Sequence, residues 1–258
     1  MKYHHCIFAH LLLIAPLYAN ESGQVLSHFS LALETKSFDY REFDTDGTLL
    51  DSEQSNSLRG VSLGFDVPLG NNDRLSAKQS WLSGNTQYIG FYLGSGGSYG
   101  EVRSITKNTF LEGNLDYTLY RPSKFGELLW SVGGGYRYWG RQLSDGHFEE
   151  YFWPYAKTSI GTSLKLSPYD RIKLTTAYHH ALNPKMFSNY YGTFNLGKTE
   201  GFELSIPWRS QYTEHWSTEM RYSYTQWTIG RSNVINKMVE PDSKTLQHTA
   251  TLTLMYHF

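Results

Sequence analysis

The chain has 258 residues, with 23 Lys or Arg against 24 Asp or Glu, so its formal net charge is −1. This balance excludes the bulk basicity that is typical of nucleic-acid-binding proteins. The mean hydropathy is −0.47 although 16% of the residues are aromatic, and no segment after residue 19 approaches the roughly 18 apolar residues of a membrane-spanning helix.

Residues 1–19 are typical of a secretory signal peptide. Lys2 gives a weakly basic start, an apolar run extends from Cys6 to Ala15, and Ala19 is a small residue suited to the cleavage position. The run is too short to span a bilayer as a helix, and its cysteine stands near its beginning, which argues against a lipoprotein. We therefore expect export, cleavage after Ala19, and a single domain over 20–258 without disulfides.

The rest of the chain alternates apolar and polar residues with a period of two. Leu111, Leu115 and Leu119, for example, alternate with polar residues such as Glu112 and Asp116, which predicts strands with one apolar and one polar face. In the third segment the alternation loses phase near residues 81–84, which predicts a β-bulge there. The ten predicted segments are 26–43, 56–67, 75–93, 107–120, 127–142, 151–166, 171–183, 200–209, 215–230 and 245–258.

The connections between these segments alternate in length. The short ones are Pro68–Arg74, Arg121–Gly126, Ser167–Asp170 and Ser210–Glu214. The longer ones are Asp44–Ser55, Gly94–Thr106, Leu143–Glu150, Pro184–Thr199 and Arg231–Lys244. Short turns on one side and long loops on the other predict an all-β fold: a closed antiparallel transmembrane β-barrel of about ten strands, with short periplasmic turns and longer extracellular loops.

The last strand strengthens this interpretation. Residues 252–258 alternate apolar residues and finish on Tyr256 and Phe258, which resembles the terminal strand of Gram-negative outer-membrane β-barrel proteins. The resemblance implies that the barrel-assembly machinery recognises Tyr256 and Phe258, and that the chain resides in the cell outer membrane with lipid and lipopolysaccharide as partners. Aromatic residues suited to the membrane interfaces occur near strand ends, at Trp130, Trp153, Trp208, Trp216, Tyr222, Tyr224 and Tyr256.

If the apolar face meets lipid, the other face lines the lumen. This parity predicts an interior charge network of Glu112, Asp116, Arg137, Lys157, Glu203, Glu219 and Arg221, joined by Arg141, Lys165, Lys173, His179 and Arg209. Both signs occur on neighbouring strands, so ion pairs can fill the lumen, and ten strands leave too little width for a general porin. A narrow small-solute channel is the alternative.

In size the chain resembles two ten-stranded groups, the omptin surface proteases and the Opc-type adhesins. The omptin resemblance implies paired aspartates facing an Asp–His pair that activate a water, and the candidates are Asp44 and Asp46 in the first loop and Asp145 and His147 in the third. Omptins carry these groups in their second and fourth loops, and Asp46-Gly47 and Asp145-Gly146 are also ordinary turn sequences. The sequence therefore favours solvated turns over catalysis.

Other chemistries have less support. His180 with Ser188 and Asn189 could serve an outer-membrane deacylase, but a lone outward histidine is more often an interfacial polar residue. The sequence contains no cysteine or histidine cluster for a metal and no phosphate-binding loop, so we expect no cofactor and no nucleic-acid partner. Basic residues at the predicted outer rim that could contact lipopolysaccharide are Arg103, Lys107, Lys185, Lys198, Arg231, Lys237 and Lys244. We expect a surface-exposed structural or interaction barrel, adhesin-like and not an enzyme, with the rim hydrolase and the narrow channel as alternatives.

Overall fold

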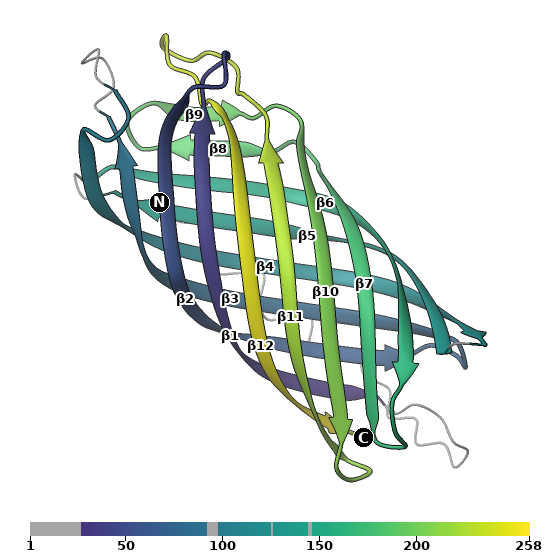
Figure 1. Ribbon diagram of the computed structural model, residues 1–258. Helices are drawn as coiled ribbons and strands as arrows, with labels where there is room; N and C mark the ends of the chain where they lie inside the picture. Colours follow the sequence, from purple (N-terminus) through teal and green to yellow (C-terminus); the bar gives the residue numbers. More distant parts are fainter. Residues whose placement is uncertain (1–26, 92–97, 125, 144–145) are drawn as a thin grey trace.

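The computed structural model describes residues 27–91, 98–124, 126–143 and 146–258 (Figure 1). The expected signal peptide and Asp145 lie outside these residues. All regular structure in the described part is β-strand, and none of it is a helix long and apolar enough to cross a membrane. The strands are β1 (His28–Phe43), β2 (Leu49–Pro68), β3 (Asp73–Gly90), β4 (Val102–Ser123), β5 (Gly126–Gln142), β6 (Phe148–Lys165), β7 (Asp170–Ala181), β8 (Lys185–Ser188), β9 (Gly192–Asn195), β10 (Thr199–Gln211), β11 (Trp216–Ile229) and β12 (Asp242–His257).

Ten of these strands form a closed antiparallel ring. β1 pairs with both β2 and β12, the order continues through β11, β10, β7 and β6, and the pairing of β5 with β6 completes the ring. The strands are staggered. Following paired residues from strand to strand once around the ring, a path that starts at Ile105 of β4 comes back to β4 at Tyr117, 12 residues further along. Such a stagger requires strands that are strongly tilted against the barrel axis. The predicted ten-stranded barrel is confirmed.

The two ends of the barrel differ as predicted. At the turn end, which we define by the connections β2–β3, β4–β5, β6–β7 and β10–β11, two to four residues separate neighbouring strands; the other end, the loop end, carries the longer connections. Phe258 N–H donates to the Ser27 carbonyl at the turn end, at 3.0 Å.

The strands reach further toward the loop end than predicted. β2 begins at Leu49, so most of the expected first loop is strand, and the expected fourth loop contains the hairpin of β8 and β9, which pairs with β6. From Asp51 to Ser55 the extension of β2 is polar on both faces, so the apolar–polar alternation that identifies a strand is absent there. The bulge is also displaced: the extra residue lies in β2, between Gln54 and Arg59, whereas β3 keeps an unbroken register with β4.

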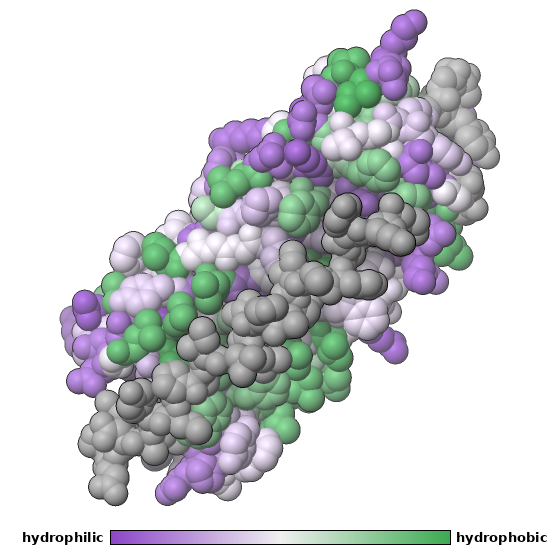
Figure 2. Space-filling model, turned by 180° about the vertical axis from the view of Figure 1, so that it is seen from behind, coloured by the Kyte–Doolittle hydropathy of each residue, from purple (hydrophilic) through white to green (hydrophobic). Residues whose placement is uncertain are grey.

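The outer surface carries an apolar belt nearer the turn end, visible between hydrophilic ends in Figure 2. On β1 its members are Phe29, Leu31 and Leu33, which are 43–64% exposed. Further along β1 the exposed positions become polar, and Arg41 forms an ion pair with Asp39. The strands therefore extend past the belt toward the loop end. One aromatic prediction is wrong, because Trp153 points into the barrel and is fully buried.

Two glycines make room for large side chains inside the barrel. A Cβ on Gly133 would lie 2.3 Å from Asp116 Oδ1, and a Cβ on Gly135 would lie 2.7 Å from the Tyr155 hydroxyl. Only glycine permits such close approach. The mid-strand glycine run on β5 thus serves lumen packing.

Candidate functional site

The aspartates proposed for a catalytic rim form turns. Asp44 accepts from the Thr45 amide at 2.7 Å and from Arg231 at 3.0 Å, and Asp46 accepts from the Thr48 amide at 2.8 Å. These backbone hydrogen bonds lower the pKa of both aspartates. Gly47, directly after Asp46, has a φ of +86°. Both aspartates therefore stabilise an exposed turn by accepting hydrogen bonds from its backbone.

His147 lies elsewhere at the loop end, between β5 and β6. Its Nε2 is 2.8 Å from Ser188 Oγ and 3.5 Å from Glu149 Oε1, and its ring stacks on Tyr190. Both of these polar contacts involve Nε2. Ser188 is also only 1% exposed. The Ser188 hydroxyl is therefore shielded from solvent and from any substrate outside the barrel.

The deacylase combination is not assembled either. His180 faces outward and lies 3.9 Å from Glu200, while Ser188 contacts His147 and Asn189 accepts from the Phe148 amide. Among the described residues, no group of three or more His, Cys, Asp or Glu side chains is arranged to hold a metal ion.

A buried ionic cluster occupies the inside of the loop end. Arg141 contacts Glu53 at 2.6 Å, Glu149 at 2.8 Å and Glu42 at 3.6 Å, and its guanidinium lies over the Tyr40 ring. Glu240, from the β11–β12 loop, accepts from Tyr151 at 2.5 Å. The sequence analysis placed Arg141 inside but not its partners, because Glu53 and Glu149 fell in expected loops.

On the turn-end side of this cluster, a layer of buried and mostly aromatic side chains fills the lumen; we call it the aromatic layer. Its side chains are between 0% and 3% exposed, and Trp139 stacks on Tyr151 with ring centroids 4.5 Å apart. The inward face of the hairpin, Met186 and Phe194, packs on the same core. The layer consists of Phe38, Leu58, Leu82, Phe110, Trp139, Tyr151, Trp153 and Trp227.

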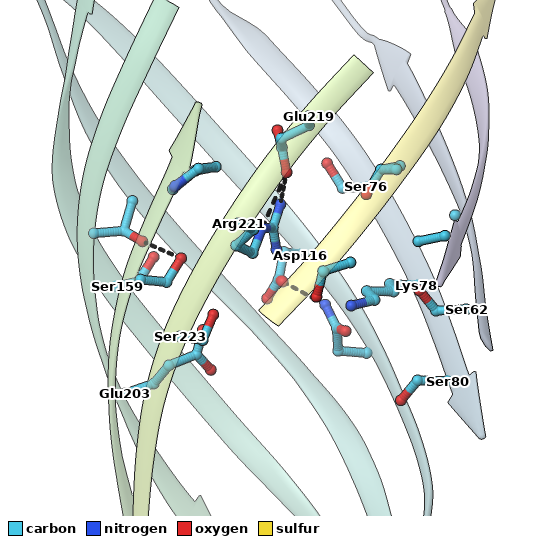
Figure 3. Close-up of a pocket in the computed structure, with 18 of the residues that line it drawn as sticks. Ser62, Ser76, Lys78, Ser80, Asp116, Ser159, Glu203, Glu219, Arg221 and Ser223 are labelled. Atoms are coloured by element: carbon cyan, nitrogen blue, oxygen red, sulfur yellow. Dashed lines mark hydrogen bonds and ion pairs between the residues drawn. The ribbon is translucent and has the colours of Figure 1, made fainter. Parts of the chain in front are cut away.

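The turn-end half of the lumen is hollow, which differs from the expected filled lumen. A cavity of about 360 Å³ extends from the aromatic layer to strand ends such as His28 and Arg209. In Figure 3 serines from several strands line it, and Asp116, Glu203, Glu219 and Arg221 point into the same space. All seven residues of the predicted charge network line this cavity.

Within the cavity most charges are paired. Glu112 contacts Arg137 at 2.7 Å, Asp116 contacts Lys157 at 2.9 Å, and Glu219 contacts Arg221 at 2.7 Å. Glu203 faces His179 at 3.5 Å, outside hydrogen-bond geometry. The alternation in the sequence thus placed the charged residues inside the barrel, whereas the individual ion pairs could be assigned only from the register of the paired strands.

The two residues of the expected assembly signal lie at the closing seam of the barrel. Tyr256 faces outward and packs edge-on against Trp216, at 5.0 Å between ring centroids. Phe258 stacks on Phe65 of β2 at 6.2 Å. Their recognition by the assembly machinery remains a prediction.

The architecture is similar to those of solved barrels. The outer-membrane protease OmpT from Escherichia coli superposes with a TM-score of 0.58 at 9% identity, over 90% of this chain and 97% of that one. The fold is that of an outer-membrane β-barrel protein. The translocator domain of the autotransporter NalP from Neisseria meningitidis gives a TM-score of 0.47 at 12% identity, over 92% and 90% of the two chains. The toluene transporter TodX from Pseudomonas putida gives 0.37 at 11% identity, over 90% of each chain. No protein-family model and no curated protein matches the sequence.

The outer surface of the barrel independently supports a location in a lipid membrane. A closed barrel satisfies every backbone hydrogen bond of its ring without water, and an apolar belt of this kind is stable only against lipid. The barrel therefore resides in the cell outer membrane. Outer-membrane barrels have short turns on the periplasmic side and longer loops outside, which assigns the turn end to the periplasm and the loop end to the exterior.

Proposed function

We propose that this protein is a surface-exposed interaction barrel that meets lipopolysaccharide and extracellular ligands with its loop end. The observation that carries the proposal is the aromatic layer, because any solute crossing the lumen would have to displace Trp139 and Trp153, which are fully buried. A barrel closed in this way offers its partners an outer surface.

The hairpin of β8 and β9 provides that surface. Phe187 on β8 lies beside Phe148 on β6, with ring centroids 5.9 Å apart, and each is 37% exposed. Lys185 is exposed on the same outward face of β8. Aromatic rings and a cation just beyond the belt suit the sugars and phosphates of lipopolysaccharide.

Other predicted rim cations are engaged within the protein. Arg231 binds Asp44, Lys198 binds Glu200 at 2.8 Å, and the Lys244 ammonium lies 5.9 Å from the centre of the Phe43 ring. The other four, Arg103, Lys107, Lys185 and Lys237, form no ion pair among the described residues. Lys185 is therefore the strongest candidate, because aromatic rings accompany it.

Binding of lipopolysaccharide to the purified barrel tests the proposal. A ligand that binds only the folded state raises the unfolding midpoint, so added lipopolysaccharide is expected to raise the midpoint of the wild type and to raise it less in the double variant Lys185→Gln/Phe187→Ala. The matched control is Lys165→Gln/Leu166→Ala, an exposed pair at the turn end. Equal shifts in both variants would contradict the assignment.

A planar-bilayer measurement tests the closed lumen. The wild-type barrel is expected to insert without stepwise ion current. Reproducible current steps from the wild type would instead favour the narrow channel.

A further inference from the structure

The lumen is electrically polarised along its axis. At the loop end, Arg141 is surrounded by the acidic side chains of Glu42, Asp51, Glu53, Glu149 and Glu240. The turn-end cavity has the opposite sign, because its lining holds eight Lys or Arg against six Asp or Glu. The cavity therefore attracts negative charge.

The unbalanced cations lie where the cavity approaches the turn end. Lys173, the fourth residue of β7, lies over the face of Tyr120, with Nζ 5.5 Å from the ring centre. Arg209, near the turn end of β10, bonds Ser217 and His257. Neither forms an ion pair with a carboxylate in the part of the chain that the structure describes. Both lie at strand ends, where an anion from the periplasm would arrive.

The closed end of the cavity holds free donors. Lys36 and Arg137 share the single carboxylate of Glu112, at 3.5 Å and 2.7 Å, which leaves one positive charge in excess. Arg137 is 2% exposed, yet among the described residues its Nε and Nη2 find no hydrogen-bond partner, and neither does Nε2 of the neighbouring Gln247. Arg137 Nη1 faces Gln247 Oε1 at 3.5 Å, so these donors belong to one pocket wall.

The aromatic layer fixes this end. The Arg137 guanidinium lies 5.2 Å from the Phe110 ring centre and 5.6 Å from that of Trp227, so it cannot swing away to find another acceptor without leaving these rings. Burying donors without partners is costly, and a ligand oxygen would satisfy them. The volume of about 360 Å³ has room for about a dozen water molecules or one small organic anion.

We propose that the turn-end half of the lumen is a blind well that binds one small oxyanion, a carboxylate or a phosphate, admitted from the periplasmic side. Arg137 and Gln247 hold the anion at the closed end. Lys173 and Arg209 raise its local concentration at the entrance by electrostatic attraction. Serine and threonine hydroxyls along the wall complete its hydrogen bonds.

Calorimetric titration of the folded barrel with inorganic phosphate, and separately with acetate, tests the well. We expect saturable binding of one anion per barrel, weakened about tenfold or more by Arg137→Gln, because a charge-assisted donor is lost. Lys173→Gln should weaken binding by a smaller factor that shrinks as salt rises. Lys107→Gln, an exposed lysine on the outer face of β4, is the matched control and should change nothing.

The two titrations also separate the ligand chemistries, since the tighter anion identifies the preferred class. If Arg137→Gln does not fold, the anion affinities of Lys173→Gln and Lys107→Gln are compared instead, and the proposal requires weaker binding in Lys173→Gln. Absence of saturable heat with both anions, or equal losses in Lys173→Gln and Lys107→Gln, would overturn the proposal.

A labelling experiment tests the sign of the well without changing its cations. Ser223 lines the cavity and is labelled in Figure 3, and residues 20–258 contain no cysteine. In a Cys6→Ser background, Ser223→Cys should react faster with a negatively charged methanethiosulfonate than with a positively charged one, and phosphate should slow the reaction. Equal or reversed rates would refute an anion-attracting lumen.

Discussion

Arg141 donates from both Nε and Nη2 to a single oxygen of Glu53, at 2.9 Å and 2.6 Å. The other oxygen of Glu53 accepts from Asn108 at 3.0 Å and from Thr86 at 2.7 Å. Glu53 is 0% exposed, so its charge is compensated entirely inside the protein. This pair ties β2 to β5 across the lumen and holds the loop end together.

Replacing Glu53 by Gln should therefore destabilise the barrel strongly. Removing one partner of a buried ion pair costs about 3–5 kcal/mol, and the change also replaces the carboxylate that accepts from Asn108 and Thr86. The control is Asp39→Asn, which breaks the Arg41–Asp39 pair, where Arg41 is 51% exposed, and should cost less than about 1 kcal/mol. Urea unfolding of the refolded barrel in lipid vesicles measures both. Similar losses would show that the Glu53 pair contributes no more than a surface pair.

The ring and the side of each strand that faces inward were predictable from the sequence, because the belt imposes a period of two. Glu112, Asp116 and Arg137 line the cavity as their parity required. Past the belt the outward face is polar and the inward face carries carboxylates as well, so Glu53 and Glu149 were assigned to loops and the cluster around Arg141 was missed. An inward parity continued from the β1 pattern would have placed Glu42 inside the barrel.

The candidate catalytic residues could not be resolved from the sequence for a different reason. Asp44, Asp46 and His147 occur near turns, and turn chemistry and catalysis use the same residue types. Only the three-dimensional structure shows that Asp44 binds Arg231 and that His147 contacts Ser188. The cavity in the turn-end half of the lumen was also unpredictable. Its volume depends on how the tilted strands space their small serine and threonine side chains.

The aromatic layer predicts a large effect of truncating Trp139. Its ring contacts Phe38, Tyr40 and Phe110, and its indole N–H donates to Asn108 Oδ1 at 2.6 Å. Trp139→Ala should lower the free energy of unfolding by about 3–5 kcal/mol, as large truncations in cores do. Trp81→Ala, on the lipid-facing side and 54% exposed, should cost much less. Equal costs would contradict a packed layer inside the lumen.

Glu240 predicts a pH dependence of the β11–β12 loop. Burial beside the carboxylates of Glu42 and Glu149 raises the pKa of Glu240. A raised folded-state pKa contributes stability that is present below the unfolded-state pKa and lost as pH rises through the folded-state value. Amide exchange at Ser232, which donates to the Glu240 carbonyl at 3.0 Å, should therefore be better protected at acid pH, after correction for intrinsic exchange rates.

Glu240→Gln removes the titrating group and should abolish that difference. The exposed Glu214 at the turn end provides the control, because Glu214→Gln should leave the dependence intact. Protection that increases with pH in the wild type would show that Glu240 remains ionised without cost.

The last prediction separates the interaction barrel from a rim hydrolase. A hydrolase at this rim would need His147 to take a proton from water or from Ser188 while a carboxylate orients its other ring nitrogen. Here Ser188, whose Oγ lies 2.8 Å from Nε2, is only 1% exposed, and Glu149, 3.5 Å from the same nitrogen, also binds Arg141 at 2.8 Å. His147 therefore joins the hairpin to β6, and His147→Ala should weaken this attachment by about 1 kcal/mol, as the loss of one hydrogen bond does. Incubation of the folded wild-type barrel with a basic peptide and with an ester substrate should give no cleavage above the no-protein rate, and neither His147→Ala nor Ser188→Ala should alter it. Cleavage by the wild type that disappears in His147→Ala, while that variant still migrates as a folded barrel, would replace the interaction assignment by an enzymatic one.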